Sequence, residues 1–445
     1  MAIPEGLRTA LNQIRETSIQ DNTLFARYVP EIMPDTDIGS YAAAITADQN
    51  VYNEFFTRLV KKIVYSQVET RVFRNKLKML EGDRMPLGAI GEEIYINPVK
   101  GRRFNVDDFA GLLAKYDADM KVQYPAINSD IQYPVTITRA KAKTAFTSWT
   151  ALENFISGIT DALYNSAYID EYNLTKGLVA DAYLTNSVQM QTITIPSDES
   201  TAKAFITKCR EIFLNMQEPT SDYNAWAKVG GYGNAVVTWS NPEDIVVLLR
   251  SDIASIVDVQ ALAAAFNIEY SKFLGQVITV KDFSVRDSEG SVVKDGSNIY
   301  AMIADKSWFR IKKQDFELDE FYNANSRCWN LYLNSVSMYN FSLFSNACVL
   351  CASVPTIKPT TITLVPSTAS VEEDDTVELK AVTVPFQANA TITYTSNNTD
   401  KATVAAKSGD NKTAVVTGKA DGSVTITAAV DSVSGTATVT VTDPA

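Results

Sequence analysis

Residues 144–178, TAFTSWTALENFISGITDALYNSAYIDEYNLTKGL, carry the longest helical pattern in the chain. Large apolar side chains recur in it at spacings of three and four residues, at Trp149, Leu152, Ile156, Ile159 and Leu163. This spacing places them on one face of an α-helix, and that face must be buried. Thr150 and Glu153 have the spacing of a capping box, so we expect the helix to begin between Ser148 and Thr150. At ~1.5 Å per residue, a helix over residues 149–178 would be about 45 Å long, which suits a scaffold for the surrounding domain.

The composition is that of a folded, acidic protein. Of 445 residues, 46% are hydrophobic and 10% are aromatic, which is enough to fill the cores of two or three domains. The net charge of −12 argues against a chain that is held to nucleic acid by its overall charge. The N-terminal stretch lacks the apolar core of a secretory signal, and no run approaches the ~18 apolar residues of a membrane span. We therefore expect no conventional export and no membrane partner.

The chain contains no histidine. This absence removes the serine and cysteine catalytic triads and the common zinc sites, all of which use an imidazole. Cys348 and Cys351 form a C-x-x-C motif, but in a strand they would point to opposite faces and could not share a metal. Neither Cys209 nor Cys328 supplies a second spaced pair, so we expect buried, unreactive thiols. The sequence predicts no catalytic residue, no cofactor-binding residue and no metal ligand, which argues against an enzyme.

Residues 1–50 are expected to form an N-terminal arm. A short helix is predicted around Leu7–Glu16, followed by an irregular segment interrupted by Pro30 and Pro34. Such an arm can wrap a partner, although a frayed terminus has the same pattern. Apolar side chains then recur with helical period over residues 51–64, which predicts an amphipathic helix.

The most basic part of the chain follows. Between positions 58 and 78, seven positive side chains stand against the single acidic residue Glu69, a local net charge of +6. The seven are Arg58, Lys61, Lys62, Arg71, Arg74, Lys76 and Lys78. A charge run of this kind is most often a solvated face. The functional alternative is that the last four bind an acidic surface of a neighbouring subunit or packaged nucleic acid.

The remaining elements are read from turn signals and periodicity. Glycines and prolines punctuate residues 79–105, which predicts a long extended loop, and Asn105 is a plausible cap for a helix over residues 104–120. Strands are predicted at 135–139, around Ile193 and Ile195, at 245–249 and at 273–280. Further helices are predicted at 203–216 and from Asp258 to Phe266. The glycine-rich run at 229–234 lacks the Gly-Lys-Ser/Thr of a phosphate-binding loop, so it predicts a mobile loop instead.

The composition changes abruptly at Pro355. Residues 356–445 hold 20 Thr and 13 Val but only two aromatic residues, Phe386 and Tyr394. Seven short alternating segments separated by turns predict a β-sandwich. The module resembles a bacterial immunoglobulin-like group 2 domain in its motifs Val384-Pro385, Thr395-Ser396-Asn397, Ala402-Thr403-Val404, Val416-Thr417-Gly418, Gly422 and Ile426-Thr427-Ala428. Tyr394 stands where that family usually has a tryptophan.

Several separate motifs stand out in the preceding region, over roughly residues 50–355. They are TAF-x-SW at 144–149, YNSA at 164–167 with DEY at 170–172, PLG…EEIY at 86–95, the blocks at 258–267 and 273–277, and DKSWF at 305–309. In these motifs the region resembles the major capsid proteins of small short-tailed phages of the phi-29 type.

This resemblance implies an α+β fold of the Hong Kong 97 capsid type, followed by the all-β immunoglobulin-like sandwich. It implies a capsid-fold domain over 51–355, with an extended loop at about 66–105, a spine helix at about 149–178 and an axial domain at about 180–275. The implied function is a major capsid protein that self-assembles, as pentamers and hexamers, into the icosahedral or prolate shell around the double-stranded DNA of a tailed phage. Implied partners are scaffolding protein, portal protein and, by weak contacts only, the packaged DNA. The implied location is the virion, after assembly in the bacterial host cytoplasm.

Three other functions are less consistent with the sequence. An encapsulin-like nanocompartment shell could share the fold, but the immunoglobulin-like module argues against it. A cell-surface adhesin could share the module, but no signal peptide or wall anchor accompanies it. A hydrolase would need an identifiable catalytic site, and neither histidine nor an assembled pair of carboxylates is present.

Overall fold

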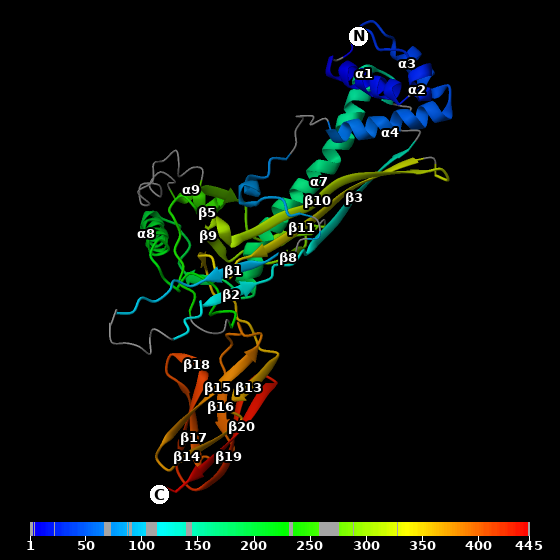
Figure 1. Ribbon diagram of the computed structural model, residues 1–445. Coiled ribbons are helices and arrows are strands. Elements are labelled where there is room, and N and C mark those ends of the chain that lie inside the picture. Colours follow the sequence, from blue (N-terminus) through cyan, green and yellow to red (C-terminus); the bar gives the residue numbers. More distant parts are fainter. Residues whose placement is uncertain are drawn as a thin grey trace. The chain divides into compact units, whose positions relative to one another are not determined.

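The computed structural model describes residues 3, 5–21, 23–65, 73–86, 88, 91–103, 114–138, 145–230, 235–257, 276–287, 289–326 and 328–443 of the chain. The chain divides into two compact units (Figure 1). The first comprises Met1–Gly91, Pro125–Thr175 and Arg310–Asn340, and the second comprises Glu92–Tyr124, Lys176–Phe309 and Phe341–Ala445. Each unit therefore combines segments that are far apart in the sequence.

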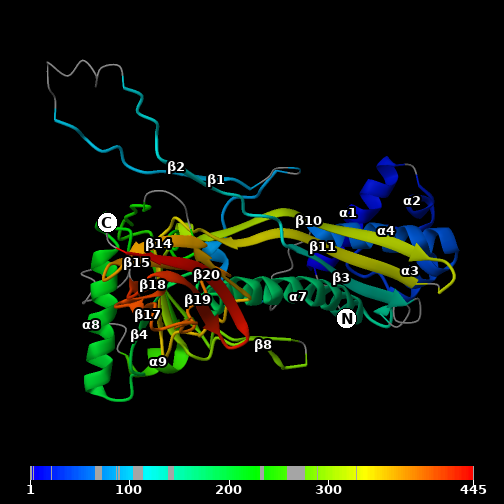
Figure 2. The ribbon, with the colours of Figure 1, turned by 90° about the horizontal axis from the view of Figure 1, so that it is seen from below.

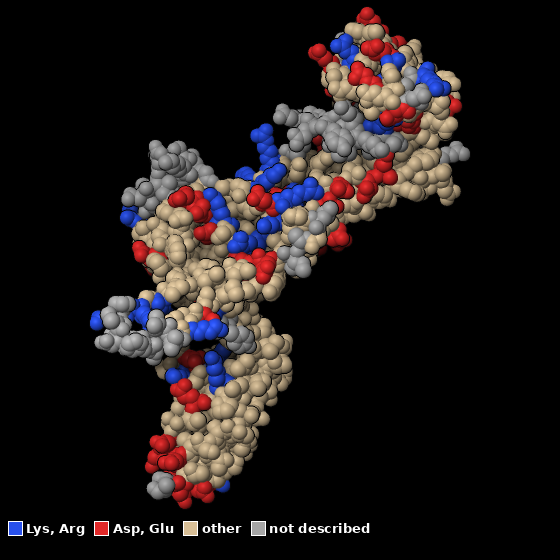
Figure 3. All heavy atoms as spheres, in the orientation of Figure 1, with Lys and Arg blue, Asp and Glu red and all other residues tan. Residues whose placement is uncertain are grey.

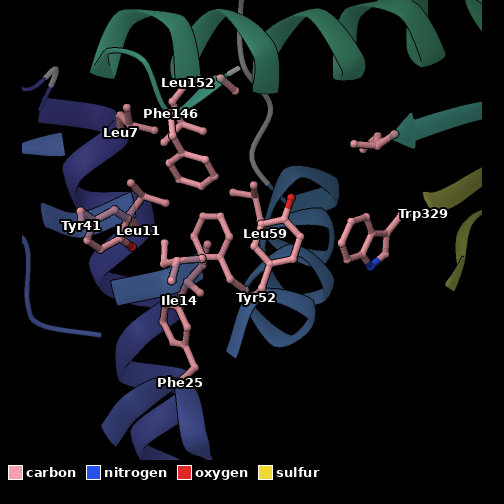
Figure 4. Packing of buried hydrophobic residues seen from close by; sticks show 14 of the residues in the cluster. Leu7, Leu11, Ile14, Phe25, Tyr41, Tyr52, Leu59, Phe146, Leu152 and Trp329 are labelled. Carbon is pink, nitrogen blue, oxygen red and sulfur yellow. The ribbon is translucent and has the colours of Figure 1, made fainter. Parts of the chain in front are cut away.

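Helices at the N-terminus form one end of the first unit. They are α1 (Glu5–Gln20), α2 (Leu24–Tyr28), α3 (Ile38–Thr46) and α4 (Gln49–Tyr65). The helices predicted around 7–16 and at 51–64 are confirmed as α1 and α4. The expectation of an irregular segment after α1 is wrong, because Phe25 of α2 and Tyr41 of α3 are fully buried anchors that fold this segment onto α4. Figure 4 shows both rings in a common core with Leu11 and Ile14 of α1.

The longest helix is α7 (Trp149–Leu184), which confirms the prediction made from its apolar period. Its buried face includes Trp149, Leu152 and Leu163, and these side chains belong to the core of the N-terminal helices. The predicted capping box is wrong, because Ser148 Oγ accepts the N–H of Ala151 at 3.1 Å and Thr150 lies inside the helix.

The helix also continues six residues beyond the predicted end at 178. The added turns are buried: Val179, Ala180, Ala182 and Tyr183 are all almost inaccessible to solvent. The helix ends at Leu184, and Asn186, two residues later, has the left-handed backbone conformation typical of a helix C-terminus, with φ of 52°. There the N–H of Ser187 donates to the carbonyl of Ala182 at 2.8 Å.

A three-stranded antiparallel sheet runs alongside α7 within the first unit (Figures 1 and 2). Its strands, in the order β10-β11-β3, are β10 (Phe309–Asn323), β11 (Cys328–Phe341) and β3 (Ser129–Thr138). The predicted strand at 135–139 is confirmed as the end of β3, which begins earlier, at Ser129. Trp329 of β11 lies opposite Ile137 of β3, and both side chains enter the helical core.

A mixed five-stranded sheet forms the centre of the second unit. Its order is β4 (Gln189–Thr192), β12 (Ala347–Cys351), β9 (Ile299–Asp305), β5 (Ile245–Arg250) and β6 (Val277–Val280). Helices α8 (Glu199–Asn215) and α9 (Ser251–Ile256) pack into one core with it. Short elements of the same unit are β7 (Val285–Arg286), β8 (Val292–Lys294) and the 3-10 helix η2 (Lys306–Trp308).

The predictions for this sheet have mixed outcomes. The strand at 245–249 and the helix at 203–216 are confirmed as β5 and α8. The strand predicted at 273–280 is confirmed as β6 over Val277–Val280, and its residues 273–275 lie outside the described residues. The strand expected around Ile193 and Ile195 lies earlier, as β4 at Gln189–Thr192, and the N–H of Ile193 still donates to the carbonyl of Cys351 in β12 at 3.0 Å. The predicted helix from Asp258 to Phe266 and most of the predicted loop at 229–234 lie outside the described residues.

The C-terminal module is a β-sandwich of two four-stranded sheets. One sheet has the order β13 (Thr361–Val365), β15 (Thr376–Val384), β18 (Asp410–Gly418), β17 (Ala402–Lys407). The other has the order β14 (Thr368–Glu372), β20 (Val433–Thr442), β19 (Gly422–Val430), β16 (Thr393–Ser396). All seven predicted strands are confirmed, and their inward side chains form a separate core. The sequence missed β14, because only one of its side chains, Val371, is fully buried.

The fold class is therefore α+β followed by an all-β sandwich, as predicted. Within the described part of the chain, no helix is both long enough and apolar enough to span a membrane.

Candidate functional site

The basic segment singled out by the sequence lies around the 3-10 helix η1 (Lys76–Leu80). Asn75 caps η1 by accepting the N–H of Leu77 at 2.9 Å, and Leu77 is buried. Because these contacts hold the backbone, Arg74 and Lys76 are left exposed to solvent. Arg71 lies outside the described residues. The structure thus places three of the four predicted contact residues, Arg74, Lys76 and Lys78, at the surface of the first unit.

Lys78, the fourth of these residues, lies beside a buried ionic cluster of its own subunit. Its Nζ is 5.8 Å from the centre of the Tyr168 ring on α7. One turn further along α7, Glu171 Oε1 is 2.5 Å from Lys313 Nζ of β10, and Glu81 is 3.7 Å from the same nitrogen. This cluster connects the segment after η1, α7 and β10.

Burial dominates the chemistry of Glu171. Its side chain is 6% exposed, and desolvation raises the pKa of its carboxyl, while the bond to Lys313 opposes that rise. Sequence reasoning missed the pair, because no periodicity or spacing connects a residue in a helix to one in a distant strand. One signal was present in the sequence: a carboxylate lies in the helix with the longest apolar pattern, and a carboxylate that is buried requires a partner.

A second candidate surface is the two-stranded ribbon of β1 (Glu93–Ile96) and β2 (Met120–Gln123) in the second unit. One face of the ribbon is anchored. Tyr95 stacks on Phe344 with ring centres 5.7 Å apart and donates a hydrogen bond to the carbonyl of Val237. Glu93 accepts a hydrogen bond of 2.6 Å from the hydroxyl of Ser342.

The other face of the ribbon is apolar and open to solvent. In the antiparallel register, Ile94 lies opposite Val122 and Ile96 lies opposite Met120, so the four side chains share one face. Ile94, Ile96 and Met120 are 51%, 54% and 55% exposed, respectively. We call these four residues the ribbon face. Contiguous exposed apolar side chains on a short sheet are typical of a contact surface for another chain.

The ribbon changes two sequence predictions. Part of the predicted extended loop at 66–105 is described, and it contains strand β1. The predicted helix over 104–120 is only partly described, since residues 104–113 lie outside the described residues. Its last part is wrong: residues 114–119 have no regular structure and Met120 begins β2. Pairing with β1 has overridden the local helical preference there.

Apolar side chains are also exposed on the N-terminal helices of the first unit. They are Ile19 at the end of α1, Leu24 and Tyr28 of α2, and Met33 after it. Positive and negative side chains are interspersed on the visible face of these helices (Figure 3). This surface is therefore neither strongly acidic nor strongly basic.

The cysteines are buried, as predicted. Cys348 and Cys351 lie in β12, and Cys209 of α8 shares a core with Cys348. Burial raises the pKa of the Cys348 thiol to about 12 and that of Cys351 to about 11, so both are protonated near neutral pH. Within the described ranges, no group of His, Cys, Asp and Glu side chains is arranged to hold a metal ion.

Comparisons with known proteins give the families of the two parts of the chain. The family model described as "Phi29-like phage major capsid protein" matches residues 11–351, and the model described as "Bacterial Ig-like domain (group 2)" matches residues 359–441. The ribbon, α7 and the ionic cluster all lie inside the first match.

Individual relatives carry the name major capsid protein. The protein of Bacillus phage B103 is 29% identical, over 82% of this chain and 77% of its own. That of Bacillus phage PZA is 28% identical, over 78% of this chain and 74% of its own. That of Streptococcus phage Cp-1 is 23% identical, over 66% and 81%, respectively.

A solved structure supports the fold. A chain of the capsid of Staphylococcus phage Andhra superimposes with a TM-score of 0.52 at 15% identity, covering 65% of this chain and 87% of that one. Together with the family match over residues 11–351, this confirms the capsid resemblance carried by the sequence motifs. The chain belongs to the Phi29-like phage major capsid protein family.

Proposed function

We propose that this chain builds the shell of a tailed phage by repeated self-association into pentamers and hexamers, and that the ribbon face docks on a neighbouring copy. The observation that carries the proposal is the ribbon itself. Its inner face is held in place by Tyr95 and Glu93, while Ile94, Ile96 and Met120 stand exposed on the other face. A shell subunit is surrounded by copies of itself, so a second copy is the partner that this surface meets most often.

The energy of such a contact suits assembly. Each of the three side chains is about half exposed, so covering one of them would contribute roughly 1 kcal/mol. A single contact is therefore weak and reversible, which lets a misplaced subunit leave. A closed shell repeats the contact many times, and each copy is held by several neighbours at once.

The exposed basic side chains supply a second contact in this proposal. Arg74 and Lys76 are exposed, and the chain carries a net charge of −12, so a neighbouring copy can present acidic surface to them. Lys78 contributes less to this contact, because it also faces Tyr168 of its own subunit. Packaged double-stranded DNA would be touched only by weak contacts, since the overall charge is repulsive.

Further parts of the proposal rest on the family and the composition. Scaffolding protein and portal protein are the proposed assembly partners, and assembly takes place in the bacterial host cytoplasm. We assign no catalytic role, because the sequence has no histidine. The proposed boundaries remain an arm over 1–50, a capsid-fold domain over 51–355 with its axial part at about 180–275, and the immunoglobulin-like module over 356–445. An encapsulin-like shell is not favoured, because the family match is to phage capsid proteins.

The test changes the ribbon face without disturbing its anchors. Ile94→Asp with Met120→Asp places two charges that are not directly opposite each other in the register. The matched control is Val365→Asp with Val384→Asp, two valines of the C-terminal module that are 50% and 56% exposed. Full-length proteins are co-expressed with a scaffolding protein and examined by sedimentation and electron microscopy.

We expect shells from the wild type and the control, but only free subunits or small oligomers from the ribbon variant. Its thermal unfolding should match that of the wild type, because the altered side chains are exposed. Shells at wild-type yield from the ribbon variant would contradict the docking role of the ribbon. Small oligomers from the wild type itself would contradict the shell function.

A further inference from the structure

The segment that leads into the immunoglobulin-like module is tied to the second unit along its length. The N–H of Ala352 donates to the carbonyl of Asn298 at 2.9 Å. The next carbonyl, of Ser353, accepts the hydroxyl of Tyr183 at 2.7 Å, and Tyr183 is buried near the end of α7. The composition change at Pro355 suggests a linker, yet its first residues are fixed to the sheet and to the long helix.

The following residues of this segment are bound by a loop of the module itself. Asn389, in the loop after β15, donates from Nδ2 to the carbonyl of Pro355 at 2.9 Å. Its Oδ1 accepts the N–H of Ile357 at 2.7 Å, and its own N–H donates to the carbonyl of Ile357 at 3.0 Å. Three hydrogen bonds from one residue leave little freedom at the point where a flexible hinge would be expected.

The same loop contacts the turn that ends at Gly230. A Cβ at Gly230 would lie 2.8 Å from Cγ of Phe386, so the Phe386 ring is packed directly on the glycine. Lys412 also contacts the ring, with its Nζ 4.7 Å from the ring centre. Phe386 does not belong to the core of the sandwich. The ring therefore lies outside that core, between the turn at Gly230 and Lys412 of its own module.

Asn186 forms the third contact. Its left-handed backbone lies two residues after the end of α7, and its Nδ2 donates to the carbonyl of Gln387 at 3.1 Å. Its Oδ1 accepts Lys228 Nζ at 2.8 Å, and Lys228 also donates to the carbonyl of Val188 at 2.8 Å. The lysine thus holds the asparagine side chain in the orientation that reaches the loop.

We infer that residues 385–389 are a docking loop that fixes the immunoglobulin-like module in one orientation on Asn186 and the turn at Gly230. The occupant of this surface is the chain's own module. The module is then a rigid projection of each subunit instead of an appendage that swings on a linker. This inference concerns the isolated subunit and does not depend on the proposed docking between copies.

Amide hydrogen exchange on the unassembled full-length protein tests the inference. Phe386→Ala removes the ring, and Asn186→Asp keeps an acceptor for Lys228 but loses the donor to Gln387. Gly230→Ala adds a Cβ against the ring, and its control is Gly290→Ala, which has a comparable φ of +85° but no neighbour within 4 Å.

We expect Phe386→Ala, Asn186→Asp and Gly230→Ala to speed exchange of the Ala352 and Ile357 amides by tenfold or more. Gly290→Ala should leave those two amides unchanged. Amides of β19 and β20 report whether the sandwich is still folded, and they should be unaffected in every variant. Exchange at wild-type rates in the first three variants would overturn the inference, as would an unprotected Ile357 amide in the wild type.

Disulfide trapping gives a second measurement that does not depend on exchange. The pair Gly230→Cys with Phe386→Cys should crosslink rapidly under mild oxidation, because the two positions are in contact. The pair Gly290→Cys with Phe386→Cys is the control and should remain reduced. Equal crosslinking of the two pairs, or none in the first, would show that the module is not docked at Gly230.

Discussion

Replacing Lys313 by methionine should destabilise the first unit severely. Lys313 Nζ is 2.5 Å from Glu171 Oε1, and the side chains are only 15% and 6% exposed. Methionine fills a similar volume without a charge, so the main loss is the partner of a buried carboxylate. Removing one member of a buried ion pair costs about 3–5 kcal/mol, and we expect about 3 kcal/mol because the positive charge of Lys78 still acts on the Glu171 carboxyl.

The cost should depend on pH in a defined direction. Burial raises the pKa of Glu171 in the folded chain above its ordinary value of 4.5, and loss of Lys313 raises that pKa further. When the pKa of a carboxyl is higher in the folded chain than in the unfolded chain, the group contributes to stability at pH values below its pKa in the unfolded chain. That contribution is lost as the pH rises through the pKa in the folded chain. The difference between variant and wild type should therefore be largest at pH 8 and should shrink as pH falls toward 4.5. Glu81, Lys78 and Tyr168 face the same carboxyl and are present in both proteins.

Tryptophan fluorescence in a denaturant titration measures this effect. All five tryptophans precede residue 356, so the C-terminal module does not contribute to the signal. Lys312→Met, the adjacent lysine of β10, is the control for removing a charge from the strand. Lys313→Met combined with Glu171→Gln should recover part of the loss, because no unpaired charge is then buried. The reasoning would be refuted if the free energy of unfolding of Lys313→Met at pH 8 lay within 1 kcal/mol of that of Lys312→Met. It would also be refuted if the loss of stability in Lys313→Met were the same at pH 5 as at pH 8.

Two further predictions concern the cores. Leu152→Ala should lower the free energy of unfolding by about 3 kcal/mol in the same fluorescence titration, since Leu152 is fully buried. Ile159→Ala should lower it by less, because Ile159 is only partly buried. Equal losses in the two variants would argue against the packing of α7 described above. A fragment over residues 356–443 should unfold as one cooperative transition in a calorimeter, because its strands enclose a core of their own; a broad, non-cooperative trace would contradict this.

Some of the fold could be predicted from local pattern alone. The apolar period from Trp149 to Leu163 encodes which side of α7 is buried, so the helix could be placed before any partner was known. Alternating residues in segments such as Thr376–Val384 likewise define the inner face of a strand. The Cys348 and Cys351 thiols were correctly expected to be buried, because the whole strand around them is apolar.

Other features depend on contacts that no local pattern contains. Residues 104–120 have helical character, yet Met120 begins a strand because β1 is available to pair with it. Ser148, and not Thr150, caps α7, since the cap is decided by where the chain enters the helix. The sequence alone showed a surplus of positive charge between Arg58 and Lys78 but not its partners.

The sequence by itself therefore determined the class of each module, the long helix and the absence of a histidine-based site. The tertiary structure decided that Glu171 is paired with Lys313, that the ribbon face is exposed and that Phe386 packs on Gly230. The physical reason is the range of the interactions. Periodicity reports the direction in which a side chain is buried, whereas an ion pair, a strand register or a docked loop exists only after distant segments have met.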